Sequence, residues 1–359
     1  MTISNEVLGA AKIKVLGVGG GGCNAITRMY KQRIVGVEYL ALNTDAQSLL
    51  SMEIPDSIRI GEKLTKGQGV GGDPKKGGAS AEESQAEIQS KLMGADMIFV
   101  AAGMGGGTGT GAAPVVARIA KETTDALVVG VVTKPFEFEG NRRTQVAEEG
   151  IKELRKHCDT LLAIPNERLN VICEEEITTA NAFRMADDVL RIGVQSIAEV
   201  VTTTGEINTD FADVNAIMRN AGPAWMSIGY GAGEDRAKDA VRQALQNPLL
   251  DISIEGAKGV LFNIVGGTDL KLEELKIAAD EINRLADPGV NMIFGMGTDE
   301  KMNSEIRVTI IATGFETNES YIDMNDTSDE IFTILDEKTK GKYAPIDLPP
   351  FLRKYVQNA

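Results

Sequence analysis

Two glycine-rich runs, each placed at the end of a short apolar segment, constrain the fold of this chain more than any other feature. GVGGGGCN occupies residues 17–24 at the end of IKVLGV (13–18), and GMGGGTGTGAAP occupies 103–114 after ADMIFVAA (95–102). Glycine leaves its backbone amide accessible and adopts conformations that other residues avoid, so such runs are typical of anion-binding loops between a strand and a helix. The pair predicts an α/β fold with phosphate-binding loops, and plain tight turns are the alternative.

The rest of the first half supports this interpretation, because short apolar segments alternate with helical patterns. Further strands are expected at 37–43, 126–132 and 160–166. Nearly continuous apolar strands separated by helices imply a parallel sheet covered on both faces. Ligands of such sheets bind beyond the carboxyl ends of the strands. Both glycine runs fall at that edge, with helices expected from Asn24 and from Ala112.

A long helix and a second unit follow. Apolar residues recur at helical spacing from Thr179 to Val201, which predicts a helix that connects two domains. Beyond Gly205 strands and helices alternate again, as in a smaller mixed α/β domain. A length of 359 residues also favours two domains over one core.

Charge and composition exclude several functions. The net charge of −15 argues against nucleic acid as a partner, because phosphate backbones need a basic face. The single histidine, His157, stands at a predicted helix end, where a solvated cap is favoured over catalysis. Cys23, Cys158 and Cys173 lack paired spacing and indicate reduced thiols. No apolar segment reaches the roughly 20 residues of a membrane span. A cytoplasmic protein without membrane insertion is expected.

The first glycine run alone leaves the ligand open. Gly17, Gly19 and Gly22 fit the dinucleotide pattern GxGxxG, and Asp45 is placed to contact a ribose, so an NAD-dependent oxidoreductase is one alternative. The second run argues against it, because two loops surround a chain of two or three phosphates and a dinucleotide fold normally uses one. Thr108 and Thr110 add hydroxyl donors there. A scaffold that binds a nucleotide and hydrolyses it only incidentally is the other alternative.

A third glycine stretch, KGQGVGGDPKKGG at 66–78, has no apolar pattern. It predicts a mobile loop that either closes over a terminal phosphate or lies on the surface only.

Side chains for a base are expected near the start of the long helix. Phe183 and Asp187 are four residues apart and share a face. An aromatic ring stacks on a purine, and a carboxylate accepts two N–H donors, which guanine offers on its Watson–Crick edge and adenine does not. Asn166 is placed for a further base contact, and Glu139 and Arg143 suit a ribose hydroxyl and a phosphate.

A second acidic group, Asn208, Asp210 and Asp213 in NTDFAD, lies beyond the long helix. Asp213 as the N-cap of a following helix is the ordinary interpretation. From Asp187 to Val201 the helix advances about 20 Å, so these acids emerge far from the nucleotide of their own chain. If they are catalytic, they act on a neighbour's nucleotide. Such a heterologous contact repeats as a filament unless it closes into a ring.

Taken together, these motifs resemble the FtsZ family, the tubulin-like GTPases of bacterial cell division. GGGTGTG at 105–111 matches the family signature, and GVGGGGCNA, LNTD, VVTKPFEFEGNRR, IPNERL, AFRMADDVL and NTDFADV extend the match over roughly residues 12–315. The final DLPPFLRK resembles the tail peptide that binds membrane-tethering adaptors.

The resemblance implies a tubulin/FtsZ-like fold: a Rossmann-like parallel-sheet GTPase domain, a long central helix and a smaller mixed α/β domain. It divides the chain into a GTP-binding domain (1–178), the central helix (179–203), a GTPase-activating domain (204–315), a flexible acidic linker (316–344) and an adaptor-binding peptide (345–359).

It also implies GTP or GDP as ligand, Mg²⁺ on the phosphates with no side chain assigned as its ligand, and head-to-tail homopolymers. Hydrolysis would use Asn208, Asp210 and Asp213 on the neighbouring subunit's GTP. Partners would be the chain itself and division adaptors bound through 346–359, at the mid-cell division site on the inner face of the membrane. The nucleotide-binding set would be Gly19, Gly20, Gly21, Gly22, Asn24, Asn43, Asp45, Gly103, Gly105, Gly106, Gly107, Thr108, Gly109, Thr110, Gly111, Pro135, Glu139, Arg143, Asn166, Phe183 and Asp187.

Overall fold

The structure is a computed structural model. It describes residues 11–32, 34, 36–167, 169, 178–202, 210–245, 256–285, 289–299, 302 and 304–315. The predictions on Asn208, Cys173, the linker (316–344) and the terminal peptide (345–359) lie outside these residues.

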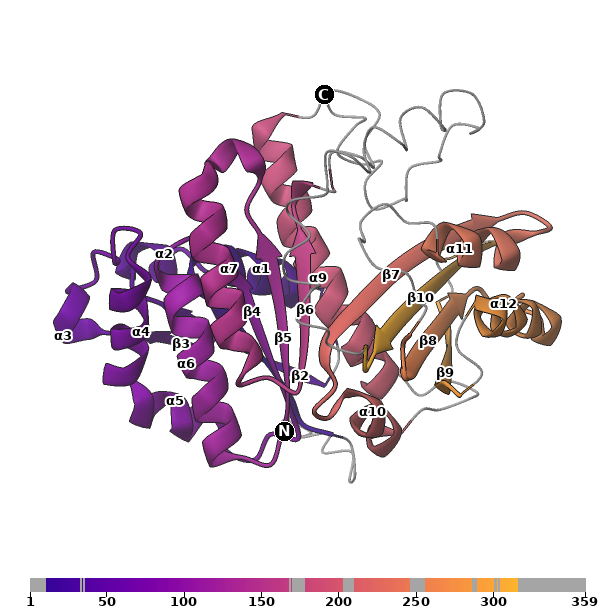
Figure 1. Cartoon of the computed structure of the whole chain (residues 1–359), viewed down its shortest axis with the longest axis horizontal. Helices are drawn as coiled ribbons and strands as arrows, with labels where there is room; N and C mark the ends of the chain where they lie inside the picture. The colour runs from indigo at the N-terminus through magenta and orange to yellow at the C-terminus, as the bar shows by residue number, and fades with distance from the viewer. Residues whose placement is uncertain are drawn as a thin grey trace, which may run out of the picture.

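The first unit alternates strands and helices, as its apolar pattern predicts (Figure 1). Its elements are β1 (Ile13–Val18), α1 (Gly19–Gln32), β2 (Val37–Asn43), α2 (Ala46–Leu50), β3 (Ser57–Arg59), α3 (Glu62–Thr65), α4 (Pro74–Glu83), α5 (Gln85–Leu92), β4 (Met97–Gly103), α6 (Thr108–Thr123), β5 (Leu127–Lys134), the 3-10 turn η1 (Glu137–Glu139), α7 (Asn141–Arg155), β6 (Thr160–Pro165) and α9 (Thr179–Thr202).

The second unit follows the same logic. Its elements are α10 (Phe211–Met218), β7 (Gly222–Ala232), α11 (Arg236–Leu245), β8 (Gly259–Gly266), α12 (Leu272–Leu285), β9 (Asn291–Thr298) and β10 (Glu305–Thr313). No helix in the described ranges is long and apolar enough to cross a membrane.

One sheet of ten strands runs through both units, in the order β3-β2-β1-β4-β5-β6-β7-β10-β8-β9. Strands β1 to β6 are parallel, whereas β10 runs antiparallel to both β7 and β8. The units join where β6 and β7 pair in parallel over Thr160–Leu162 and Gly222–Ala224. The mostly parallel α/β fold expected from the sequence is therefore confirmed, with the sheet continuous across the junction.

Helices cover both faces of the sheet because alternate strand residues point to opposite sides. Val15 and Phe99 pack with α1 and α9, whereas Leu16 and Val100 pack with α5, α6 and α7. The core on the α9 side continues into the second unit through residues of α10, β7, β8 and β10. The long helix predicted over 179–201 is present, and most of its apolar face is buried in this core.

Three helices begin earlier than predicted. α1 begins at Gly19 rather than Asn24, α6 at Thr108 rather than Ala112, and α10 at Phe211. For α1 and α6 the reason is glycine, whose low helix propensity leads a sequence pattern to place the helix start after a glycine run. Backbone packing against neighbouring strands overrides this preference here.

Candidate functional site

The two glycine loops meet at the point where the strand order reverses. β1 pairs with β2 on one side and with β4 on the other, and Val18 stands opposite Ala102 at the carboxyl ends of the neighbouring strands. The loops that follow β1 and β4 are therefore adjacent, at the crevice where open α/β sheets bind ligands. The structure thus brings together two runs about 85 residues apart in the sequence.

Several glycines are required by close backbone approach. A Cβ on Gly22 would lie 2.1 Å from the Ala101 carbonyl oxygen, and one on Gly109 would lie 2.6 Å from the Gly103 oxygen. Gly19 has φ +71°, and a Cβ there would lie 2.6 Å from the amide nitrogen of Gly109. At these positions the backbones of the two loops and the strand ends approach too closely for a side chain.

Two other glycines border open space. A Cβ built on Gly20 or Gly106 meets no described atom within 4 Å. Gly20 and Gly21 stand in the first turn of α1, and Thr108 opens α6, so their amides have no partner within their own helices. Free amides at two adjacent helix N-termini form a cradle that favours a bound anion.

The cradle uses fewer amides than the sequence predicted. The Gly105 amide donates to the Thr110 hydroxyl at 2.8 Å, and the Gly111 amide donates to the Gly107 carbonyl at 3.1 Å. Thr110 is buried, so its side chain fixes the loop rather than projecting freely toward a ligand. The loop itself therefore occupies two of the amides in the predicted nucleotide-binding set, those of Gly105 and Gly111.

Alanine substitutions at an open glycine and at a packed glycine distinguish a role in ligand binding from a role in stability. We expect Gly106→Ala to unfold like the parent but to bind a nucleoside triphosphate about 10-fold more weakly, because its methyl enters the cradle. Gly107→Ala should instead lower the free energy of unfolding by about 1–3 kcal/mol, since its Cβ would lie 2.6 Å from Val70 Cγ2. Titration calorimetry and chemical denaturation measure both. Unchanged affinity of Gly106→Ala would place the phosphates elsewhere.

The third glycine stretch packs against the second glycine loop, since a Cβ on Gly77 would lie 2.3 Å from Gly107 O, and it bonds to the segment after β2. Gly69 N donates to Thr44 O at 3.2 Å, and Ala46 N donates to Gly67 O at 3.1 Å. Residues 74–78 form the first turn of α4, capped by Asp73. The prediction of a mobile loop over the whole of 66–78 is therefore wrong, because these bonds and the helix hold it beside the cradle.

Residues of the LNTD motif shape the loop after β2. The Asn43 carboxamide oxygen accepts the Thr44 amide at 2.8 Å, and Asp45 caps α2 by accepting the Gln47 amide at 2.9 Å. Thr44 is buried, and its hydroxyl lies 2.7 Å from the Thr108 hydroxyl. Asn43 and Asp45 thus have structural roles. Thr44 was missed by the sequence analysis, although it stands between two residues that were named.

Asp187, which the sequence predicts as a base contact, is a mostly buried carboxylate of α9. Its side chain is 15% exposed, and it faces Arg28 of α1 across 3.4 Å. Burial raises its pKa from 3.8 to about 6, and the charge of Arg28 partly opposes this rise. Asp188, next to it, is buried and pairs with Arg191 instead. Nothing in the sequence indicated Arg28, because the pair joins α1 to α9 across a tertiary contact.

Three phenylalanines surround the start of α9. Phe183 lies edge-on to Phe136 and Phe138, with ring centroids 5.6 and 6.1 Å away, and Phe136 stacks on Phe138 at 5.1 Å. Phe183 remains 41% exposed, which leaves ring surface for a ligand. Asn166, at the end of β6, is buried, and its carboxamide oxygen has no hydrogen-bond partner among the described residues. An unpaired buried acceptor at this edge fits a donor on the ligand.

Glu139 and Arg143 pair with each other in this structure. Glu139 accepts the Phe136 amide at 2.9 Å with one oxygen and the Arg143 guanidinium with the other. A Cβ on Gly105 would lie 3.3 Å from Pro135 Cγ and 3.0 Å from the Arg143 carbonyl, so this segment adjoins the second glycine loop. Arg143 is 55% exposed and keeps further N–H donors beside this pair.

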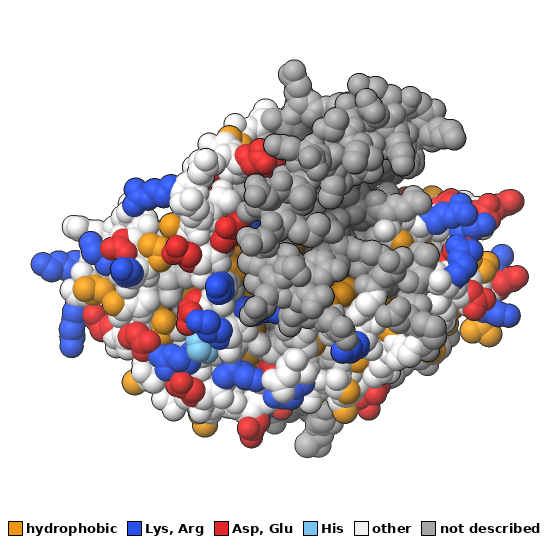
Figure 2. Space-filling view, viewed as in Figure 1, with side chains coloured by type: hydrophobic (Ala, Val, Ile, Leu, Met, Phe, Trp, Pro, Cys, Tyr) orange, Lys and Arg blue, Asp and Glu red, His pale blue; other side chains and the backbone are white. Residues whose placement is uncertain are grey.

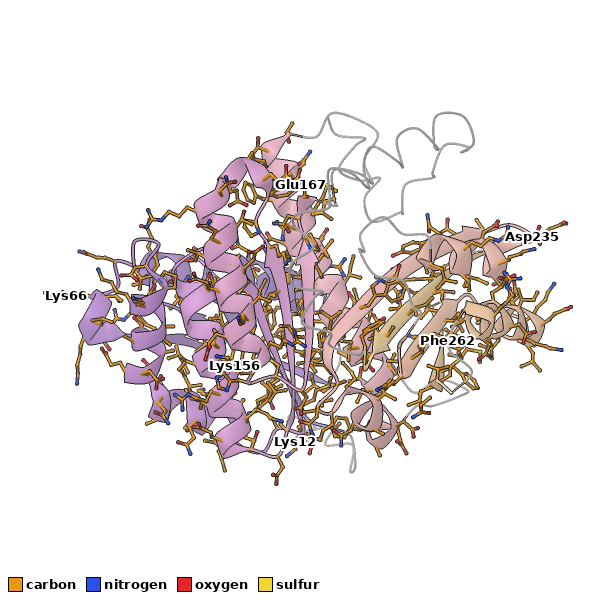
Figure 3. The ribbon with its side chains drawn as sticks, in the orientation of Figure 1. Lys12, Lys66, Lys156, Glu167, Asp235 and Phe262 are labelled. Atoms are coloured by element: carbon orange, nitrogen blue, oxygen red, sulfur yellow. The ribbon has the colours of Figure 1, made fainter. Side chains whose placement is uncertain are left out.

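The acids of α10 lie at the opposite edge of the sheet. The carboxyl end of α10 contacts the starts of two strands: the first residue of β6, Thr160, donates its hydroxyl to Met218 O at 2.5 Å, and Arg219 donates to the carbonyl of Asp125, before β5, at 2.9 Å. Figure 3 marks the two edges by Lys12, before β1, and Glu167, after β6. Strands of six to eight residues separate them by about 20–26 Å.

Within this acidic turn the cap differs from the prediction. Asp210, rather than Asp213, is the N-cap of α10, and its carboxylate accepts the Asp213 amide at 2.8 Å. Asp213 stands in the first helical turn, and both side chains are exposed. The helix starts three residues earlier than expected, which moves the cap to Asp210 and leaves the Asp213 carboxylate facing solvent.

Comparisons with known proteins agree with this arrangement. Residues 12–174 match the model of the GTPase domain of the Tubulin/FtsZ family, and residues 222–316 match that of the C-terminal domain of the FtsZ family. A solved structure described as an empty FtsZ dimer from M. jannaschii is 46% identical. That match covers 85% of this chain and 88% of the other, with a TM-score of 0.82.

More distant relatives share the fold. A CetZ2 protofilament from Haloferax volcanii with bound GTPγS is 22% identical, with a TM-score of 0.72, over 90% of this chain and 99% of the other. A GDP-bound CetZ1 monomer from the same organism is 23% identical, with a TM-score of 0.71, over 91% and 99%.

Proposed function

This chain belongs to the FtsZ family of tubulin-like GTPases, and we propose that its hydrolysis of GTP is completed by the acidic turn of an adjacent copy in a head-to-tail protofilament. Family membership removes the NAD-dependent oxidoreductase as an alternative. One observation carries the proposal: the cradle of Gly20 and Gly106 and the acids Asp210 and Asp213 lie at opposite edges of one rigid sheet.

The nucleotide-binding roles follow from the contacts described above. The free amides near Gly20 and Gly106 hold the phosphates, and Asp187 accepts the two N–H donors of guanine, with Phe183 beside the base. The buried oxygen of Asn166 accepts a further donor. Each assignment pairs a group left without a protein partner, or partly exposed, with a matching group of GTP.

The catalytic step needs positioning more than covalent chemistry, because phosphoryl transfer passes through a loose transition state. In the proposed filament, Asp213 of one chain lies against the γ-phosphate on the next, orients the attacking water and accepts its proton. Asp210 holds the turn through the Asp213 amide. Bound magnesium would neutralise charge on the phosphate oxygens. The described residues contain no group of three or more His, Cys, Asp or Glu side chains that fits a metal, so phosphates and water would supply most of its ligands.

An intersubunit site makes turnover depend on assembly. We expect the rate of phosphate release per chain to rise with protein concentration above a threshold, and light scattering to rise at the same threshold with GTP but not with GDP or ATP. Both are measured in the same samples. A rate per chain that is independent of concentration would favour a site complete within one chain, or a scaffold that hydrolyses GTP incidentally.

We further propose that these filaments form a cell-division ring at mid-cell on the inner face of the membrane. The net charge of −15 argues against nucleic acid as a partner, and Figure 2 shows acidic and basic side chains interspersed over the face in view. The apolar and basic sequence of 346–359 suits a peptide that binds membrane-tethering adaptors.

Removal of residues 346–359 tests whether this segment serves adaptor binding and not polymerisation. We expect the shortened chain to polymerise and hydrolyse GTP like the parent, because the fold and both edges are intact, and to lose adaptor binding in a co-sedimentation assay. Loss of polymerisation would contradict this assignment.

A further inference from the structure

A fully buried carboxylate, Asp159, lies outside the nucleotide site, at the amino edge of the sheet between α7 and β6. One of its oxygens accepts the Lys121 ammonium at 2.8 Å and the Asn220 amide at 3.2 Å, and the other accepts the Val128 amide at 2.9 Å. Its side chain is 0% exposed. These three partners are all donors, so the ionised carboxylate is satisfied from three directions.

These donors come from segments that are distant in the sequence. Val128 is the second residue of β5, and Asn220 belongs to the turn between α10 and β7, where it adopts a left-handed conformation with φ +54°. The Gly222 amide adds a bond of 2.8 Å to the carbonyl of Asp159 itself. Asp159 therefore fixes the turn that ends α10 to the first unit of the chain.

α10 is the helix whose first turn carries Asp210 and Asp213. The segment just after it is tied down by Asp159, and its last residues bond to Thr160 and to Thr313, whose hydroxyl donates to Ile217 O at 2.8 Å. A helix of eight residues held at its carboxyl end is set in direction as a rigid rod, so its amino end moves if the anchor moves.

The contact between Asp159 and Lys121 connects this region to the nucleotide-binding edge of the sheet. Lys121 belongs to the last turn of α6, and α6 begins at the second glycine loop. One helix, one ion pair and one turn therefore connect the cradle to the acidic turn within a single chain. Lys121 is 32% exposed, whereas Asp159 is sealed.

We infer that Asp159 is a positioning residue for GTP hydrolysis, which holds α10 so that Asp210 and Asp213 reach the nucleotide of the next subunit. The inference rests on the proposed intersubunit function. The competing explanation is a buried ion pair that serves only stability. The two explanations differ in whether a substitution impairs the acidic turn alone or the whole fold.

Asp159→Asn keeps the shape of the side chain but turns one acceptor into an NH₂ group that faces only donors. We expect turnover at saturating GTP to fall about 10- to 100-fold, as for a catalytic group displaced by roughly 1 Å. The dissociation constant for GTP should stay near that of the parent, because the cradle is at the other edge. A purely structural role would lower thermal stability and GTP affinity together.

A mixing experiment identifies whether the nucleotide-binding edge or the acidic turn is impaired in each variant. Asp159→Asn has an intact nucleotide edge, and Asp187→Ala has an intact acidic turn, so one interface between them is complete. We expect their equimolar mixture to hydrolyse GTP well above the sum of the separate chains. A mixture of Asp159→Asn with Asp213→Ala should not recover, because both lack the same face.

A mixture of Asp213→Ala with Asp187→Ala separates the two proposals. Recovery there, without recovery for Asp159→Asn with Asp187→Ala, overturns the role of Asp159 alone. No recovery in either overturns intersubunit catalysis and this inference with it. If Asp159→Asn does not fold cooperatively, Lys121→Gln decides: the same loss and rescue supports the inference, and full activity overturns it. Lys156→Gln, which breaks an exposed pair with Glu153, is the matched control.

Discussion

Asp213→Ala should bind GTP almost like the parent and hydrolyse it at least about 100-fold more slowly, the loss typical of a removed acid–base group. The carboxylate is exposed at the amino edge of the sheet, a strand length away from the cradle of its own chain. Fluorescence titration with labelled GTP and phosphate release under polymerising conditions measure the two properties separately.

Asp213 is a cleaner probe than Asp210, because Asp210 also caps α10 and its loss would cost helix stability of about 1 kcal/mol. Glu273→Ala is the control, since Glu273 is likewise an exposed acid in the first turn of a helix. We expect it to leave turnover unchanged. A large loss of GTP affinity in Asp213→Ala would place this acid in the pocket of its own chain and contradict the filament mechanism.

Asp187→Asn should lose about 100-fold or more in GTP affinity. The substitution removes a charged acceptor and presents an NH₂ group to the guanine amino group, which leaves donors unpaired in a mostly buried site, and losses of this kind cost about 2–5 kcal/mol. Xanthosine triphosphate carries a carbonyl in place of that amino group, so we expect it to bind the variant better than GTP does.

The raised pKa of Asp187 adds a pH dependence to the same prediction. Burial raises the pKa of Asp187 in the nucleotide-free protein to about 6. GTP affinity should therefore fall as the pH drops through that value and the carboxylate is protonated. Because the folded pKa lies above the unfolded one, this group also makes the fold less stable as the pH rises from about 4 to 6. GTP affinity measured from pH 5 to 8 should lose this pH dependence in Asp187→Asn. A parent affinity that is independent of pH would argue against Asp187 as the base reader.

Much of the fold was predictable because its signals are local. Nearly continuous apolar runs such as 13–18 and 126–132 predict buried parallel strands, and the helical spacing of 179–201 predicts α9, which the structure confirms. Helix starts within glycine runs were wrong, because close packing such as Gly22 on Ala101 decides them and propensity does not.

The candidate site was predictable in its residue types but only partly in its atoms. The sequence indicated two phosphate loops, but it did not indicate that the Gly105 amide is already bonded to Thr110. It named Asp187 without its partner Arg28. It placed a cap at Asp213 where the structure has Asp210. Each difference depends on a hydrogen bond or ion pair whose geometry no residue spacing specifies.

The sequence by itself determined the α/β class, the two glycine loops, the aromatic and acidic face of the long helix and an acidic turn remote from the base. These follow from spacing along the chain, where side-chain periodicity acts over a few residues. Only the tertiary structure decided that β1 and β4 are neighbours, that the acidic turn lies at the opposite edge of the sheet, and that Asp159 ties α10 to that edge. Strand order and buried pairing arise from contacts between distant segments, and no local pattern encodes them.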